Sequence, residues 1–227
     1  MATMTGEDLK AAVLGEIDRR EAEAVGIAKE ILGTPEPGFR EYRTSKRVGE
    51  EFRRLGIPYH GGIALTGLKG MLSGGSEGPT VAVIGELDSL IVQGHPHADP
   101  DTSAAHACGH HCQIGMMFGV ALGLMAPGVM ERLAGRVALI AVPAEEYIEI
   151  EYRDDLRRAG SLEFLGGKAE FIRLGAFDDV DLAMMTHTEQ PGRSTRKFGV
   201  GATNNGMVAK RIRFGGRAAH AGGSPHA

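Results

Sequence analysis

The residues most suited to metal chemistry are concentrated between Ala105 and Gln113, where the sequence is AHACGHHCQ. Both cysteines of the chain, Cys108 and Cys112, lie there with three of its nine histidines. Cys108 and His110 flank a glycine, so a bend at that glycine can direct both side chains to one point. A thiolate and an imidazole together suit zinc and its neighbours in the first transition row. One cluster cannot complete a metal site, so further ligands must come from other parts of the chain.

Further candidate ligands follow three short apolar runs, over residues 80–85, 137–142 and 182–185, that have the composition of strands buried on both faces. The groups that follow these runs are, in order, Glu86 with Asp88, Glu145 with Glu146, and His187. Helical patterns separate the runs, which predicts an α/β fold with a mostly parallel sheet flanked by helices. In such sheets ligands bind beyond the carboxyl ends of the strands, so these groups are expected to meet at one edge.

The remaining elements are predicted from periodicity and turn residues. Thr5 can cap the first helix, and the loop that carries the cysteine–histidine cluster is long enough to suggest a function. The expected elements are helices over about 5–32, 42–55, 114–125 and 153–174 (the last interrupted near 166–167), strand and turn over 63–72, loops over 74–78 and 92–107, and a strand with one solvent-exposed face over 207–214. A domain boundary is expected near residues 191–197.

The adjacent glutamates can divide two tasks. One carboxylate of Glu145 and Glu146 can bind a metal while its neighbour, turned the other way, acts as a general base on metal-bound water. A bridging thiolate or carboxylate can hold two ions about 3.5–4 Å apart, the usual distance in two-metal hydrolases. Taken alone, His187 would more often be an ordinary core or surface histidine, and the cluster around Cys108 could be a redox or structural zinc loop. Their joint placement at three strand ends favours a metal site.

Composition narrows the class of protein. A length of 227 residues allows one large domain, or one domain with part of another. The net charge of −4 argues against a nucleic-acid surface, and two cysteines make no disulfide framework, which favours a reduced, cytoplasmic setting. No signal peptide is recognised, and the apolar run over 114–129 carries four glycines and falls short of the about 20 residues that cross a membrane.

Two other zinc or thiol chemistries fit poorly. A zinc nucleobase deaminase would need a Pro-Cys-x-x-Cys motif, which the sequence lacks. A disulfide reductase is disfavoured because Cys108 and Cys112 are four residues apart rather than three.

Together these motifs resemble those of the metal-dependent amidohydrolases of the aminoacylase and carboxypeptidase G superfamily, in the branch with hippurate, auxin-conjugate and aminobenzoyl-glutamate hydrolases. The motifs that carry the resemblance, in the family's order, are PEPGF at 35–39, GELDSL at 85–90, HACGH at 106–110, PAEE at 143–146, His187, and GGRAAHA at 215–221. The resemblance implies a di-metal exopeptidase-like catalytic domain, whose N-terminal part is residues 1–193. Residues 194–227 would begin a smaller α+β dimerisation or lid domain.

The resemblance also implies a ligand set for two divalent ions, manganese or zinc, with cobalt able to substitute. Cys108 would bridge the two ions. His110 and Glu146 would complete the protein ligands of one ion, and His187 would serve the other. These four groups are therefore expected within coordination reach of one pair of cations.

The other implied roles concern catalysis. Glu145 would be the base that activates the bridging water, and Asp88 would orient the site as an outer-shell carboxylate. Glu86, also expected in the outer shell, stands where many family members have aspartate. His220 matches a histidine of the dimerisation domain that reaches into the partner subunit's site in a homodimer and polarises the scissile carbonyl.

The implied activity is hydrolysis of an amide bond in an N-acyl or N-aroyl amino acid or a small peptide-like conjugate, with no nucleic-acid or membrane partner. Family chains are longer and supply a final histidine ligand that no residue here matches. The alternative is a truncated, catalytically incomplete member that binds metal or a partner without turnover. Two tightly held ions per chain would favour the enzyme, and one weak ion or none would favour the alternative.

Overall fold

The computed structural model describes residues 4–189 and, further along the chain, residues 192, 198–201, 206–208, 210, 212, 215–220 and 222–223. The chain divides into two units, Met1–Thr188 and Glu189–Ala227. All helices and strands of the described residues lie in the first unit. The expected strand over 207–214 lies partly outside the described residues, and it stays a prediction together with the boundary at residues 193 and 194 and the second domain.

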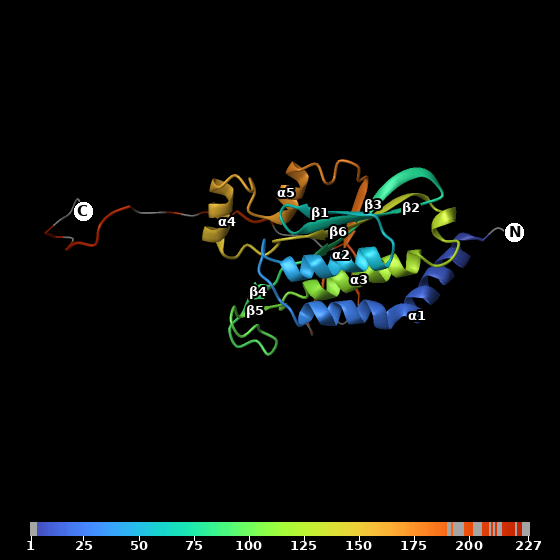
Figure 1. Ribbon diagram of the computed structural model, residues 1–227, viewed down its shortest axis with the longest axis horizontal. Helices are drawn as coiled ribbons and strands as arrows, with labels where there is room; N and C mark the ends of the chain where they lie inside the picture. The colour runs from blue at the N-terminus through green and yellow to red at the C-terminus, as the bar shows by residue number, and fades with distance from the viewer. Residues whose placement is uncertain are drawn as a thin grey trace. The chain divides into compact units, whose positions relative to one another are not determined.

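The first unit contains both helices and strands (Figure 1). Its elements are α1 (Gly6–Leu32), α2 (Tyr42–Arg54), β1 (Tyr59–Ile63), β2 (Gly67–Ser73), β3 (Ser76–Glu86), β4 (Leu90–Ile91), β5 (Ala104–Ala105), α3 (His110–Leu124), the 3-10 helix η1 (Met130–Arg132), β6 (Ala134–Val142), α4 (Ile150–Arg158), α5 (Gly167–Arg173) and β7 (Leu182–Met185).

Five strands form the main sheet in the order β1-β2-β6-β3-β7. The three strands predicted from apolar runs, β3, β6 and β7, are parallel, and Ile84 lies opposite both Ile140 and Met185. The β1–β2 hairpin adds an antiparallel edge through β2 and β6. The expected α/β class with a flanked, mostly parallel sheet is therefore confirmed. Because β3 lies between β6 and β7, the carboxyl ends of all three parallel strands are neighbours.

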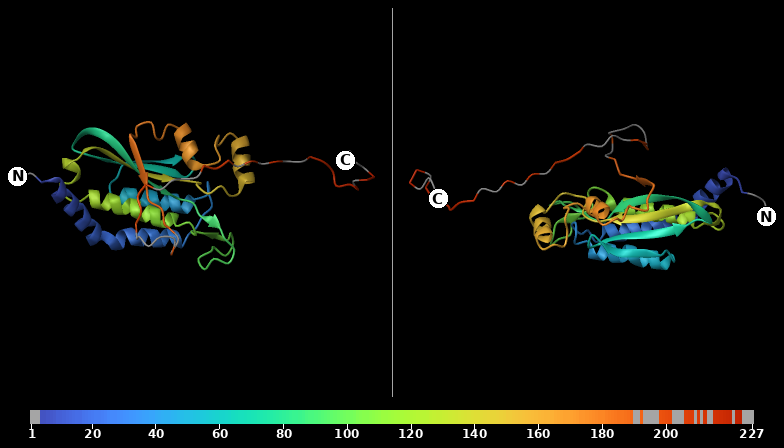
Figure 2. Two further views of the ribbon diagram at one scale, coloured as in Figure 1. Left: turned by 180° about the vertical axis from the view of Figure 1, so that it is seen from behind. Right: turned by 90° about the horizontal axis from the view of Figure 1, so that it is seen from above.

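Side chains that alternate along the central strands enter two separate cores, one on each face of the sheet. In β6, Leu139 and Ala141 pack into a core with α1, α2 and α3, whereas Ile140 and Val142 pack into a core with Phe171 of α5. This alternation is that of a strand covered on both faces, which explains its continuous apolar sequence. Helices α1, α2 and α3 lie together on one side of the sheet and α5 on the other (Figures 1 and 2).

Several boundaries differ from those predicted. The helix predicted from residue 114 begins at His110. The prediction was made from the apolar stripe of the helix, which starts four residues after the helix itself begins. The helix predicted over 153–174 is two helices, α4 and α5, separated by residues 159–166. The predicted loop at 74–78 is partly the start of β3. The predicted cap of α1 is correct, since the Thr5 hydroxyl oxygen accepts from the Asp8 amide and the Asp8 carboxylate accepts from the Thr5 amide.

The loop expected over 92–107 is bounded by β4 and β5, which pair as a small antiparallel ribbon. This ribbon lies between β3 and α3 along the chain and leads directly into the cysteine–histidine cluster. Among the described residues, none of the helices combines the length and the apolar character needed to cross a bilayer.

Candidate metal centre

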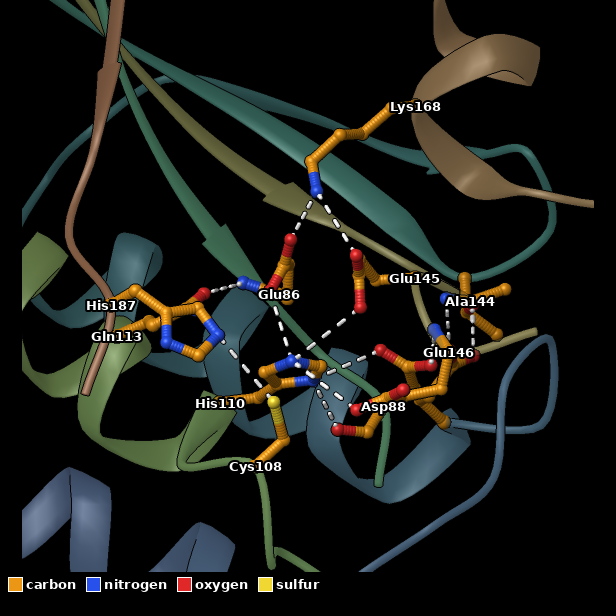
Figure 3. Close-up of polar contacts among 12 residues, drawn as sticks. Glu86, Asp88, Cys108, His110, Gln113, Ala144, Glu145, Glu146, Lys168 and His187 are labelled. Carbon is orange, nitrogen blue, oxygen red and sulfur yellow. Dashed lines mark hydrogen bonds and ion pairs between the residues drawn. The ribbon is translucent and has the colours of Figure 1, made fainter. Parts of the chain in front are cut away.

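The candidate ligands come from the carboxyl ends of the three parallel strands and from the start of α3 (Figure 3). Glu86 ends β3, and Asp88 follows it by two residues. Glu145 and Glu146 follow β6, and His187 follows β7 by two residues. Short connections after strands that share an edge place these side chains close together in space.

Cys108 and His187 are 79 residues apart in sequence, and Cys108 Sγ lies 3.5 Å from His187 Nε2. The turn between Cys108 and His110 depends on Gly109, whose φ of 90° is in the left-handed region that favours glycine. An added Cβ at Gly109 would lie 3.0 Å from Thr188 Cγ2. The Thr188 hydroxyl donates to the Cys108 carbonyl at 2.9 Å, so the end of β7 is attached directly to this turn.

His110 is the most buried histidine of the cluster, and its orientation is fixed by Asp88. Nδ1 lies 2.8 Å from the Asp88 carbonyl oxygen and 3.2 Å from Asp88 Oδ1, so the proton belongs on Nδ1, which donates. Nε2 then faces the carboxylates, at 2.9 Å from Glu86 Oε2, 3.8 Å from Glu145 Oε2 and 3.9 Å from Glu146 Oε1. It is buried, and of these three oxygens Glu86 Oε2 lies nearest to it. An imidazole with a protonated Nδ1 and a free Nε2 is the form that binds metals.

Lys168, the second residue of α5, lies over two of the carboxylates (Figure 3). Its ammonium donates to Glu86 Oε1 and lies 3.9 Å from Glu145 Oε1. Burial alone would raise the pKa of Glu86, but the contacts with His110 and the charge of Lys168 lower that pKa to about 2. Burial and the charge of Glu86 raise the pKa of Glu145 above its ordinary range. Glu86 and Glu145 therefore have different proton affinities, although both lie beside Lys168.

Two groups of potential ligands share His110. In one, the ligand atoms of Cys108, His110 and His187 lie within 4.8 Å of one another, and in the other those of Glu86, His110 and Glu145 do so. Thiolate and imidazole donors suit zinc, and carboxylate donors suit manganese as well as zinc. Nε2 of His110 lies between these groups and faces the carboxylate oxygens of Glu86 and Glu145 at 2.9 and 3.8 Å, an arrangement of donors that a cation could share. Glu86 thus lies among the potential ligands, although it was expected in the outer shell.

Asp88 has the contacts that an orienting carboxylate needs. It is fully buried, accepts from the Glu146 amide at 2.9 Å through Oδ2, and faces His110 through Oδ1. It therefore joins the end of β3 both to α3 and to the glutamate pair. The expected catalytic His220 belongs to the second unit, so its relation to this cluster stays a prediction.

The other members of the cysteine–histidine cluster do not converge on the same point. His106 is buried with its ring 5.3 Å from that of His111, and neither of its nitrogens has a hydrogen-bond partner. Burial, and then the nearby His111, lower the pKa of His106 to about 3, so this ring is neutral. Cys112 Sγ lies 3.3 Å from His111 Nε2. These residues are not part of either ligand group among the described residues.

Sequence analysis missed three charged residues around the site: Lys168, Glu41 and Arg153. Glu41 precedes α2 and is fully buried, with Oε1 accepting from the Ala144 amide at 2.8 Å. Arg153 is the largest fully buried side chain of the described residues. None of the three belongs to a short motif with a metal ligand, and burial, which identifies them, is not apparent from spacing.

An α/β sheet that gathers cysteine, histidine and carboxylate groups beyond its parallel strands defines the class of metal-dependent hydrolases with a di-metal exopeptidase-like fold. The chain is 30% identical to thermostable carboxypeptidase 2 of Saccharolobus solfataricus over 96% of its own length and 52% of that protein. It is 32% identical to IAA-amino acid hydrolase ILR1-like 6 of Arabidopsis thaliana over 71% of its length and 31% of that protein.

The fold is similar to that of a solved metallopeptidase. The crystal structure of the Bacillus subtilis YXEP protein, a dinuclear metal-binding peptidase from the M20 family, superimposes with a TM-score of 0.58 over 73% of this chain and 42% of that one, at 22% identity. No protein-family model matches the chain. The chain belongs to the M20 family of metallopeptidases and amidohydrolases. It spans about half the length of the carboxypeptidase that it matches.

Proposed function

We propose that this chain carries the metal-binding and proton-transferring part of a hydrolase that cleaves the amide bond of N-acyl or N-aroyl amino acids or small peptide-like conjugates. The observation that carries the proposal is the 3.5 Å approach of Cys108 Sγ to His187 Nε2, beside a histidine whose Nε2 faces three carboxylates. Relatives named as a carboxypeptidase, an IAA-amino acid hydrolase and, at 26% identity, an N-acetyl-L-cysteine deacetylase support the substrate class.

The residues present fit two divalent ions. Cys108, His110, Glu146 and His187 would hold the ions, manganese or zinc. The clustered ligand atoms are those of Cys108, His110 and His187 and those of Glu86, His110 and Glu145, so Glu146 enters this set through the family resemblance. When bound, the ions would lower the pKa of a water molecule and polarise the substrate carbonyl. Asp88 keeps the His110 proton on Nδ1 and so leaves Nε2 available as a ligand.

Glu145 is proposed as the general base. Its carboxylate would take a proton from the attacking water and then give it to the nitrogen of the leaving amine, so that the C–N bond breaks as a neutral amine forms. Two features support this role. Its pKa is raised by burial and by Glu86, which strengthens it as a base, and Lys168 lies 3.9 Å away, close enough to favour the anion before proton transfer. Glu86, with its low pKa, would stay ionised throughout.

Specificity and oxyanion stabilisation are proposed to involve residues outside this unit. His220 would stabilise the negative charge that develops on the carbonyl oxygen in the partner subunit's site, which requires a homodimer of the whole protein. Binding of metal without turnover is the competing outcome for this chain.

The test compares the chain with its Glu145→Gln variant on a panel of N-benzoyl and N-acetyl amino acids in the presence of manganese. Loss of the base is expected to lower kcat by about 100- to 10,000-fold, with the metal content unchanged. Glu77→Gln, an exposed glutamate at the start of β3, is the control. Turnover retained by Glu145→Gln would remove this residue from the base role. Metal bound without turnover in the unmodified chain would favour the competing outcome.

A further inference from the structure

The turn that carries both glutamates is held by charged side chains from three other segments. It follows β6, and its first residue, Ala144, has a φ of 51°, in the left-handed region that non-glycine residues rarely occupy. A residue in this region is strained and persists only where its surroundings enforce it. The backbone amide of Ala144 donates to Glu41 Oε1 at 2.8 Å, and the backbone amide of Glu146 donates to Asp88 Oδ2 at 2.9 Å.

The Ala144 and Glu146 carbonyls accept from the Gly167 and Ile148 amides, and both also accept from one guanidinium, that of Arg153 in α4. Nη1 donates to the Ala144 carbonyl at 3.3 Å and to the Leu165 carbonyl at 2.8 Å, and Nη2 donates to the Glu146 carbonyl. The fork of Arg153 therefore contacts the residue before and the residue after Glu145. Arg153 has 0% exposure and its Nε has no hydrogen-bond partner, so the contacts of the two Nη atoms must offset the cost of burying the charge.

The PEPGF turn at residues 35–39 closes over this guanidinium. Phe39 is fully buried with a φ of 61°, and the Arg153 guanidinium lies 5.5 Å from the centre of its ring. Gly38 packs so closely that an added Cβ would lie 2.8 Å from Ala144 Cα. Glu36 anchors the turn, since its Oε2 accepts from the Thr44 amide at 2.8 Å in α2. The turn thus excludes water from the Arg153 fork, and this packing gives the PEPGF motif a physical role.

The geometry points to Arg153 as a positioning residue for the metal centre. We propose that its fork sets the direction of the Glu145 and Glu146 side chains by fixing the carbonyl groups of Ala144 and Glu146. The inference rests on the proposed function, because it takes Glu146 as a ligand. A planar fork can satisfy both carbonyls at once, whereas the single ammonium of lysine cannot do so in the same geometry.

The test measures cobalt binding by the full chain, in which the Cys108 thiolate reports the ion through its charge-transfer absorption. Arg153→Lys keeps the charge and loses the fork, and it is expected to weaken cobalt binding by about 10- to 100-fold while the band remains at saturation. Arg157→Lys is the matched control, since Arg157 lies on the same helix with its side chain 53% exposed. It is expected to bind cobalt as the unmodified chain does.

A second comparison separates positioning from a general effect on stability. In a Glu146→Ala background, Arg153→Lys is expected to change cobalt affinity by less than about twofold, because two residues that act through one contact are not additive. A full additional loss in that background would overturn the proposal. Equal cobalt affinity of Arg153→Lys and the unmodified chain would also overturn it.

Thermal unfolding identifies the remaining outcomes. If Arg153→Lys does not fold, Arg153→Gln is measured instead, because it retains two N–H donors without the charge. If neither variant folds, Arg153 is needed for folding alone and the proposal is overturned. Absence of the thiolate band in the unmodified chain would refute the proposed metal centre itself. A normal band in the unmodified chain with no loss in Arg153→Lys would refute only the role of Arg153.

Discussion

Glu41 is expected to make the stability of this protein fall as the pH rises, which is the opposite of the usual behaviour of a carboxylate. The side chain is fully buried, with Oε1 accepting from the Ala144 amide at 2.8 Å and Oε2 accepting from the Thr66 hydroxyl at 2.6 Å. Burial, and then the charge of Asp88, raise its pKa from 4.5 to about 7, and the two hydrogen bonds only partly oppose this rise.

The sign follows from proton binding in the two states. Between pH 4.5 and about 7 the folded chain keeps the Glu41 proton while the unfolded chain releases it, so the folded state binds more protons. Stability therefore decreases with rising pH across this window and is level above it. At 1.36 kcal/mol per pKa unit, a rise from 4.5 to about 7 corresponds to about 3 kcal/mol.

The perturbation is Glu41→Gln, which removes the ionisation and keeps the shape. The amide oxygen can accept from the Ala144 amide, and the amide nitrogen can donate to the Thr66 hydroxyl oxygen. The free energy of unfolding of the variant, relative to that of the unmodified chain, is expected to increase by about 3 kcal/mol between pH 4.5 and pH 8.

Urea unfolding of both proteins at a series of pH values, with metal removed by a chelator, measures this difference. Other titrating groups are common to both chains and largely cancel. Glu50→Gln in α2, whose side chain is 45% exposed, is the control and is expected to follow the unmodified chain at each pH. A difference between Glu41→Gln and the unmodified chain that does not depend on pH would refute the reasoning.

Three further predictions concern the metal centre. Cys108→Ser is expected to abolish the cobalt charge-transfer band and weaken binding by about 100-fold, as measured by absorbance titration; a persisting band would show that another thiolate binds the ion. Gly109→Ala combines a φ of 90° with a clash against Thr188, so its loss in unfolding free energy should exceed that of Gly160→Ala, which strains a φ of 75° in open space, by about 1–3 kcal/mol; equal losses would contradict the clash. Lys168→Met removes a positive charge that contacts Glu86 beside the proposed metal centre, so cobalt binding should tighten by about tenfold; weaker binding would mean that Lys168 supports the site.

The strands of this fold could be predicted because both faces of the sheet are covered. In β6 every residue of the run 137–142, and in β3 Ala82, Val83 and Ile84, packs into one of two cores, which produces an uninterrupted apolar sequence. The β1–β2 hairpin gave a weaker signal, since β1 contains two adjacent glycines and is mostly exposed. The division between α4 and α5 was only partly indicated by Gly166 and Gly167, because α4 already ends at Arg158, just before Gly160 with its φ of 75°.

The clustering of the candidate site residues could be predicted from the sequence for a topological reason. Parallel strands share a carboxyl edge, so residues directly after β3, β6 and β7 must be neighbours whatever their separation along the chain. Glu86, Glu145 and His187 lie at a strand end or within three residues after one. Knowledge of the strand order was therefore enough to predict that they are close in space.

Glu41 and Arg153, which support the glutamate turn, could not be identified from the sequence, because their role depends on burial and on contacts between distant segments. Glu41 reaches the Ala144 amide over 103 residues, and Arg153 lies on a helix whose other arginines are exposed and paired with acidic neighbours. What distinguishes Arg153 from Arg157 is burial, set by how α4 packs under the PEPGF turn, and spacing along α4 does not encode it. A left-handed alanine before the glutamate pair requires such partners, because neither its own sequence nor β6 would stabilise that backbone. The ligand positions thus depend on topology, whereas the direction of the glutamate side chains depends on buried charges that only the folded chain brings together.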